Sequence, residues 1–184
     1  MLLFGVLPAW GLPGLADWAC HRRSSIEDPE HGGVRESLTH VLMFAEGAVP
    51  MGLVLLAEVN TLVVALLSVS ALVHEATARW DLQIATDSDR VVSPLEQQVH
   101  TALETIPFLV AMLAALQQAE VPTSSNPWKL RRKATPLPVG YVAGILLGTG
   151  ITGALPHLEE LWRCARKAKQ QGEDYGITRP VATE

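Results

Sequence analysis

Residues 62–80 read LVVALLSVSALVHEATARW, and this stretch carries no charged side chain from Leu62 to Val73. Crossing the hydrocarbon core of a bilayer takes about 20 mostly apolar residues, and a helix satisfies its own backbone there. Comparable apolar runs occupy four further places in the chain, at residues 2–20, 36–57, 94–117 and 139–155. The sequence therefore predicts an all-α fold, a polytopic transmembrane bundle of about five helices.

The composition agrees with a single membrane-embedded bundle. Of the 184 residues, 48% are hydrophobic, and the 14 Lys and Arg stand in short blocks between the apolar runs. A formal net charge of -5 offers no basic surface for nucleic acid, so no nucleic-acid partner is expected. We expect residues 1–155 to form the transmembrane bundle, and residues 156–184 a cytoplasmic amphipathic helix followed by a flexible tail. Cys20 and Cys164 are expected to be free thiols.

Local signals mark several helix ends. The residues Ser93-Pro94-Leu95-Glu96 combine an N-cap serine, a proline at the first helical position and a capping-box glutamate. Pro156 is expected to end the last helix. The first apolar run has no basic residue before it and two arginines after it, which reverses the polarity of a signal peptide. We therefore expect residues 2–20 to form a retained first helix.

The distribution of Lys and Arg predicts the orientation of the bundle. With the N-terminus outside, ten basic residues lie on the cytoplasmic side and four, within residues 129–133, lie outside. The positive-inside rule favours this arrangement. We therefore expect an integral protein of a bacterial cytoplasmic membrane, surrounded by membrane lipid, with its C-terminus cytoplasmic.

Titratable residues occur in pairs near the helix ends. Three pairs are spaced by four residues and one by seven: Asp17 and His21, Glu36 and His40, His100 and Glu104, and His74 and Asp81. These spacings place both members of a pair on one helix face. In an antiparallel bundle, the four helix ends that carry the pairs lie at the same face of the membrane. Charged groups in membrane helices are costly and by default functional, so this set predicts a site.

Mixed imidazole and carboxylate ligands suit a metal centre. Soluble di-iron and di-manganese bundles place such ligands on four helices around two metals. We therefore expect these eight residues to bind two divalent metal ions, with iron favoured over zinc because carboxylates nearly equal histidines in number.

Several of these polar residues also have an interpretation other than metal binding. Glu36 could favour a helix N-terminus, Asp17 and Asp81 could be interfacial acids, and His21 could lie at the level of the lipid headgroups. Glu96 is expected to be the capping-box acid, and His157 a loop or interface residue.

Three glycines lie at four-residue spacing in the last apolar run, at Gly140, Gly144 and Gly148. Such a stripe lets another helix approach closely. It predicts close packing within the fold or contact between copies in a homo-oligomer.

Four motifs carry a resemblance: DWACHRR at 17–23, ESLTH at 36–40, HEATARWD at 74–81 and SPLEQQVH at 93–100. Together they resemble an uncharacterised family of small bacterial polytopic membrane proteins over roughly residues 10–117. The resemblance implies no activity. In layout the chain is also similar to membrane-bound di-iron desaturases and hydroxylases, although it lacks their closely spaced multi-histidine boxes.

The leading hypothesis is a dinuclear, metal-dependent membrane oxidoreductase that acts on a lipid-like substrate at the cytoplasmic end of the helices. A zinc-dependent membrane hydrolase is one alternative, since alkaline ceramidases also combine histidines, an aspartate and a serine in a bundle, and Ser37 stands beside Glu36. A haem-binding electron-transfer protein and a proton or metal-ion transporter are the others.

Overall fold

The structure, a computed structural model, describes residues 2–28, 31–88, 90–120 and 126–172. It confirms the all-α prediction, because the described residues form helices and no strand, with a single isolated bridge between Ala57 and Arg132. Most of the predicted flexible tail, residues 173–184, lies outside the described residues.

Five helical stretches are long and apolar enough to cross a membrane: Leu2–Ser24, Gly33–Leu56, Thr61–Thr86, Pro94–Glu120 and Val139–Gln170. The first combines a π-helical turn, η1 (Leu2–Val6), with α1 (Leu7–Ala9) and α2 (Gly11–Ser24). The next three are α3 (Gly33–Leu56), α4 (Thr61–Thr86) and α5 (Pro94–Glu120). The last combines α6 (Val139–Thr149), a second π-helical turn, η3 (Gly150–Ala154), and α7 (Leu155–Gln170).

Side-chain caps fix two of the helix starts. The side chain of Asn60 accepts a hydrogen bond from the backbone N–H of Val63 at 3.0 Å and so caps α4. At the start of α5, the N–H of Glu96 donates to Ser93 Oγ, and the N–H of Ser93 donates to Glu96 Oε2. This reciprocal pair confirms the predicted capping box.

The fifth helix is longer than the sequence predicts. It does not end before Pro156 but continues to Gln170. Pro156 stands in the first turn of α7, where a missing N–H is tolerated, and the π-helical turn η3 immediately precedes it. The α7 helix packs against α2 and α3.

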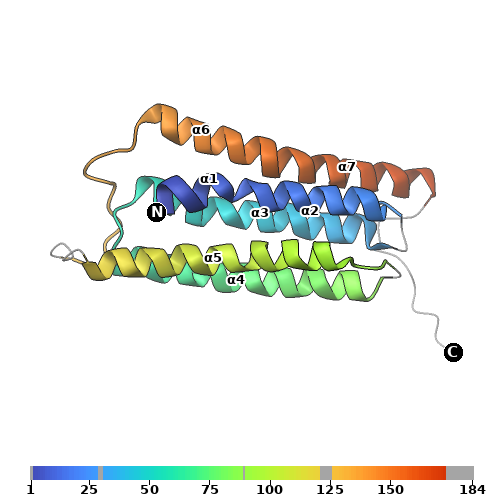
Figure 1. Cartoon of the computed structure of the whole chain (residues 1–184), viewed down its shortest axis with the longest axis horizontal. Helices are drawn as coiled ribbons and strands as arrows, with labels where there is room; N and C mark the ends of the chain where they lie inside the picture. Colours follow the sequence, from blue (N-terminus) through green and yellow to red (C-terminus); the bar gives the residue numbers. More distant parts are fainter. Residues whose placement is uncertain (1, 29–30, 89, 121–125, 173–184) are drawn as a thin grey trace.

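The helices surround a common axis (Figure 1), with α2 beside α5, α5 beside α4, α4 beside α3, and α3 beside α7. Apolar side chains fill the half of the bundle that contains the end of α3 and the start of α4. Its members include Leu7, Met51, Val54, Leu67 and Val110. Buried polar side chains gather at the opposite end, which is drawn on the right in Figure 1.

The glycine stripe of α6 meets no close neighbour within the described chain. A methyl group added at Gly140, Gly144 or Gly148 would find no atom within 4 Å beyond its own helix and chain neighbours. Tight packing of these glycines inside one copy is therefore not observed, and the contact between copies stays a prediction for measurements of oligomeric state.

Gly32 is a position where only glycine fits without strain. It precedes α3 with a φ of 97°, and an added Cβ would collide with Oε2 of Glu36. We expect Gly32→Ala to lower the free energy of unfolding by about 1–3 kcal/mol, measured by SDS titration of the detergent-purified protein. Gly52→Ala is the control, because Gly52 is helical and has open space around it. Equal stability of the two variants would contradict the assigned strain.

Candidate metal centre

Ten side chains, here called the polar cluster, meet at one end of the bundle: Asp17, His21, Glu36, His40, Asp81, Arg90, Glu96, His100, His157 and Glu160. All five membrane-length helical stretches contribute, together with the loop between α4 and α5. Nine of these residues are buried, and His100 is 16% exposed at its side chain. Burial on this scale demands that each charge find a partner.

Glu160 joins the two central histidines. The Nδ1 of His21 lies 3.0 Å from Glu160 Oε2, and the Nδ1 of His40 lies 2.7 Å from Glu160 Oε1. The two imidazole rings stack nearly parallel, 4.5 Å apart between centroids. Because an ionised carboxylate can only accept, each ring donates its Nδ1–H to Glu160. In a neutral ring, Nε2 then carries the lone pair that a metal would use.

Both Nε2 atoms are buried and make no hydrogen bond, yet each faces a carboxylate oxygen. The Nε2 of His21 lies 3.3 Å from Glu96 Oε1, and the Nε2 of His40 lies 3.2 Å from Asp81 Oδ1. A lone pair facing a carboxylate oxygen is repulsive unless a cation or a proton lies between them. Oδ1 of Asp17 is likewise buried without a hydrogen bond. It lies 2.9 Å from Nε2 of His100.

Several groups of three ligand atoms among the described residues lie close enough to hold a metal, including one of His21, Glu36 and Glu96. Two of these groups share no residue and consist only of predicted ligands. The first triad is Asp17, His21 and His100, and the second triad is Glu36, His40 and Asp81. Within each triad, the ligand atoms lie within 4.8 Å of one another. His157 lies close to both, since it forms a further group of this kind with Asp17 and His40, and its Nδ1 is buried without a hydrogen bond.

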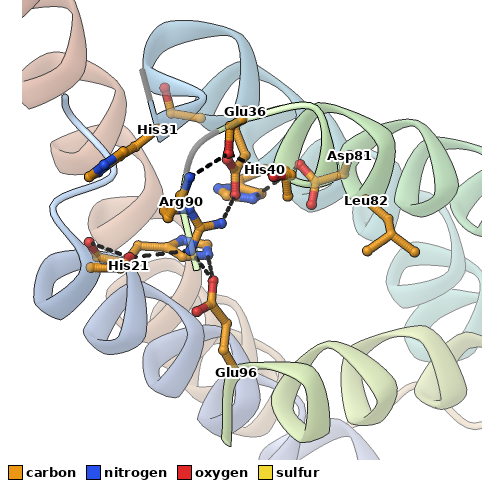
Figure 2. Close-up of polar contacts among 12 residues, drawn as sticks. His21, His31, Glu36, His40, Asp81, Leu82, Arg90 and Glu96 are labelled. Carbon is orange, nitrogen blue, oxygen red and sulfur yellow. Dashed lines mark hydrogen bonds and ion pairs between the residues drawn. The ribbon is translucent and has the colours of Figure 1, made fainter. Parts of the chain in front are cut away.

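Arg90 holds two carboxylates in place. Figure 2 shows its guanidinium between Glu36 and Glu96, to which Nη2 and Nη1 donate. Oε2 of Glu36 is left without a hydrogen bond and lies close to the backbone of Gly32. Burial opposes the charge of Arg90, but the carboxylates of Glu36 and Glu96 outweigh it and raise the pKa of Arg90 above its usual value. Arg90 is therefore cationic at any physiological pH.

The polar cluster contains more negative charge than its one guanidinium can balance. The cluster has five buried carboxylates, those of Asp17, Glu36, Asp81, Glu96 and Glu160. Arg90 pairs with Glu36 and Glu96 and is the one permanent cation of the cluster, so four negative charges remain when the histidines are neutral. Protonating both His21 and His40 instead would place two positive rings face to face at 4.5 Å.

Six of the eight predicted ligands come together in these groups: Asp17, His21, Glu36, His40, Asp81 and His100. Neither His74 nor Glu104 belongs to such a group among the described residues. The Nδ1 of His74 lies 3.4 Å from Glu46 Oε2, and the hydroxyl of Thr77 donates to Glu46 Oε1 at 2.7 Å. His74 and Glu104 do line a cavity that reaches the polar cluster.

Four members of the polar cluster were not predicted as ligands or partners. Glu160 and His157 are not predicted because Pro156 suggests a helix end. Their three-residue spacing nevertheless puts both on one helix face. Glu96 serves the predicted cap, but it also lies four residues before His100, the same spacing that links Glu36 to His40. Arg90 carries no local sequence signal, because its role depends on where the loop returns to the bundle.

No protein-family model matches the chain, and neither a curated protein nor a solved structure matches it. The resemblance to small bacterial membrane proteins therefore stays a prediction. The function is inferred from the geometry and chemistry of the polar cluster.

Proposed function

We propose that the chain is an integral membrane metalloenzyme with two divalent metal ions in the polar cluster. One metal would be held by the triad of Asp17, His21 and His100, and the other by the triad of Glu36, His40 and Asp81. Glu160 would orient His21 and His40 through their Nδ1 atoms, as carboxylates commonly do beside metal-bound histidines. Arg90 would orient Glu36 and Glu96.

The observation that carries this proposal is the charge of the polar cluster. Four negative charges remain after Arg90 is counted, and all of them are buried. Leaving charges of one sign uncompensated in a protein interior costs several kcal/mol for each group. Two divalent cations would supply the four missing positive charges and would fill the space that the unbonded Nε2 atoms face.

The ligands favour iron over zinc. The two triads offer three histidines and three carboxylates, a hard and mixed set that suits iron. With iron, such a centre would use dioxygen as the oxidant of a substrate that enters from the lipid phase. With zinc, it would activate water for hydrolysis.

The length and surface of the helices support membrane insertion. Five stretches are long and apolar enough to span, and many large apolar side chains on their outer faces are exposed, including Leu12, Val69, Leu72, Leu116 and Leu147. Exposed apolar surface on this scale indicates a lipid or protein environment. The end that carries the polar cluster also has most of the basic residues, so we place it on the cytoplasmic side of a bacterial inner membrane.

Elemental analysis of detergent-purified protein tests the metal centre, with an absorption spectrum of the same sample. We expect about two metals per chain and no Soret band. His40→Ala should lose at least one metal, because it removes one ligand of the second triad and the ring that stacks on His21 of the first triad. His31→Ala is the matched control, because His31 lies beside Ser25 and Asp28 and belongs to no group of metal-ligand atoms among the described residues.

His74→Ala separates the two sets of predicted ligands. We expect it to keep both metals, because His74 pairs with Glu46 and not with the triads. Protein purified without chelator and free of stoichiometric metal would refute the metalloenzyme. A Soret band lost in His40→Ala would favour haem binding instead.

A further inference from the structure

The bundle contains a partly open cavity of about 370 Å³, and residues of the polar cluster form part of its wall. Asp17 and His100 of the first triad and His40 and Asp81 of the second line its wall. Both proposed metals would therefore be accessible from this space. The volume lies near the lower end of the 300–1,000 Å³ typical of small-molecule sites, which suits one chain rather than a two-chain lipid.

The far end of the cavity adjoins the apolar core. Trp10 and Met51 form its floor, and both pack with the core residues of the other half of the bundle. His40 and Met51 are eleven residues apart on one helix, so the cavity is about 17 Å deep along the bundle axis. This depth is close to half of the roughly 30 Å hydrocarbon thickness of a bilayer.

The wall changes character along this depth. On α4 and α5, the deepest titratable side chains of the wall are His74 and Glu104, and His74 lies beside Glu46 of α3. Beyond that level, the described residues of α3 that line the wall are Ala48, Met51 and Gly52. A polar group placed against this part would lose its hydration without gaining a partner, whereas a hydrocarbon chain would gain by burial.

Glycines keep the deep part of the cavity wide. Gly52 of α3 and Gly150 of η3 both line it, and an added methyl group at either position would meet nothing within 4 Å. The cavity therefore has room for a bound molecule at a depth where the side chains of a close-packed bundle would otherwise interdigitate.

We propose that the cavity binds a single-chain amphiphile, with its hydrocarbon tail toward Met51 and its polar terminus at the two triads. The reacting group of the substrate is then its polar end and not a position in the middle of the chain. This assignment rests on the proposed function and names the substrate class of the same site. It also matches the placement of such a molecule in one leaflet, where the head lies at the interface and the tail reaches toward the midplane.

Two photoreactive dodecanols test the orientation, one with a diazirine at the last carbons and one with a diazirine beside the hydroxyl. An alcohol is uncharged, so it can enter whether or not metal neutralises the acids. We expect the tail-end probe to label Met51 and Trp10, and the head-end probe to label Met43 and Phe44, as mapped by mass spectrometry. Excess unlabelled dodecanol should compete both. Labelling of the same residues by both probes, or only of outward-facing leucines, would overturn the proposal.

Gly52→Leu provides the structural control. Its side chain would occupy the deep part of the cavity, and we expect it to reduce labelling of Met51 by about tenfold or more, because it displaces several methylene groups of the guest. Gly140→Leu makes the same exchange on an exposed face of α6 outside the cavity and should label like the native protein. Unchanged labelling in Gly52→Leu would overturn the proposal.

Metal content measured in the same samples separates the two proposals. Two metals per chain without competed labelling at Met51 would overturn the amphiphile and leave the metal centre intact. Competed labelling at Met51 in a protein that binds no metal would refute the metalloenzyme and support the binding orientation.

Discussion

Replacing Arg90 with methionine should lower the free energy of unfolding by about 3–5 kcal/mol. Arg90 is buried and donates to both Glu36 and Glu96, and its Nη1 also lies 3.2 Å from Ser24 Oγ. Methionine keeps most of the volume but leaves two buried carboxylates without their cation. The loss of α5 capping would add to the effect, since Glu96 also bonds Ser93. An SDS titration followed by circular dichroism measures it.

Arg79→Met is the matched control for this prediction. Arg79 pairs with Glu75 four residues earlier at 2.8 Å, but its side chain is 76% exposed. Exposed ion pairs contribute about 0–1 kcal/mol, so this variant should unfold nearly as the native protein does. If Arg90→Met proves no more destabilising than Arg79→Met, then the carboxylates of Glu36 and Glu96 do not depend on the guanidinium.

The second large effect is expected at Glu160. Glu160→Gln should weaken metal binding by about 10–100-fold, the usual cost of removing a carboxylate that orients metal-bound histidines. The native carboxylate accepts from His21 and His40 with its two oxygens. Glutamine has only one oxygen that accepts, so one ring loses its partner and the preference for carrying its proton on Nδ1. Competition with a chelator measures the affinity.

The neighbouring acid supplies the control. Glu159 points to the outside of the same helix turn, where it accepts from Trp18 Nε1 at 2.8 Å and lies 3.8 Å from Arg22. Glu159→Gln should bind metal as the native protein does. Equal weakening of metal binding in both variants would mean that the acids of α7 affect the metal affinity through their negative charge alone. Contact of Glu160 with the histidines would then not be needed.

The sequence predicts most of this fold because the helices have strong, local signals. Apolar runs and the capping box at Ser93 place the starts of the five stretches within about three residues. The ends are predicted less well, because the first stretch continues to Ser24 and the third to Thr86. The fifth fails at its end, because a proline in sequence cannot be told from a helix stop unless the π-helical turn before it is known.

The polar cluster is predictable to the extent that its members repeat a helical spacing. Asp17 with His21 and Glu36 with His40 stand four apart, and both pairs reach the cluster. The spacing fails for His74 and Glu104, which lie one or two turns deeper along the same helices and instead line the cavity. Spacing fixes the face of a helix but not the depth at which neighbouring helices bring their side chains together.

The order of synthesis gives the last helix a particular consequence. The carboxylate that bridges His21 and His40 is that of Glu160 on α7, which is made after every other member of the polar cluster. Until then, four helices carry acids and histidines whose orientation is unset. In the proposed metalloenzyme, metal acquisition would therefore be a late step of biogenesis, and a nascent chain halted before α7 would not retain either ion tightly.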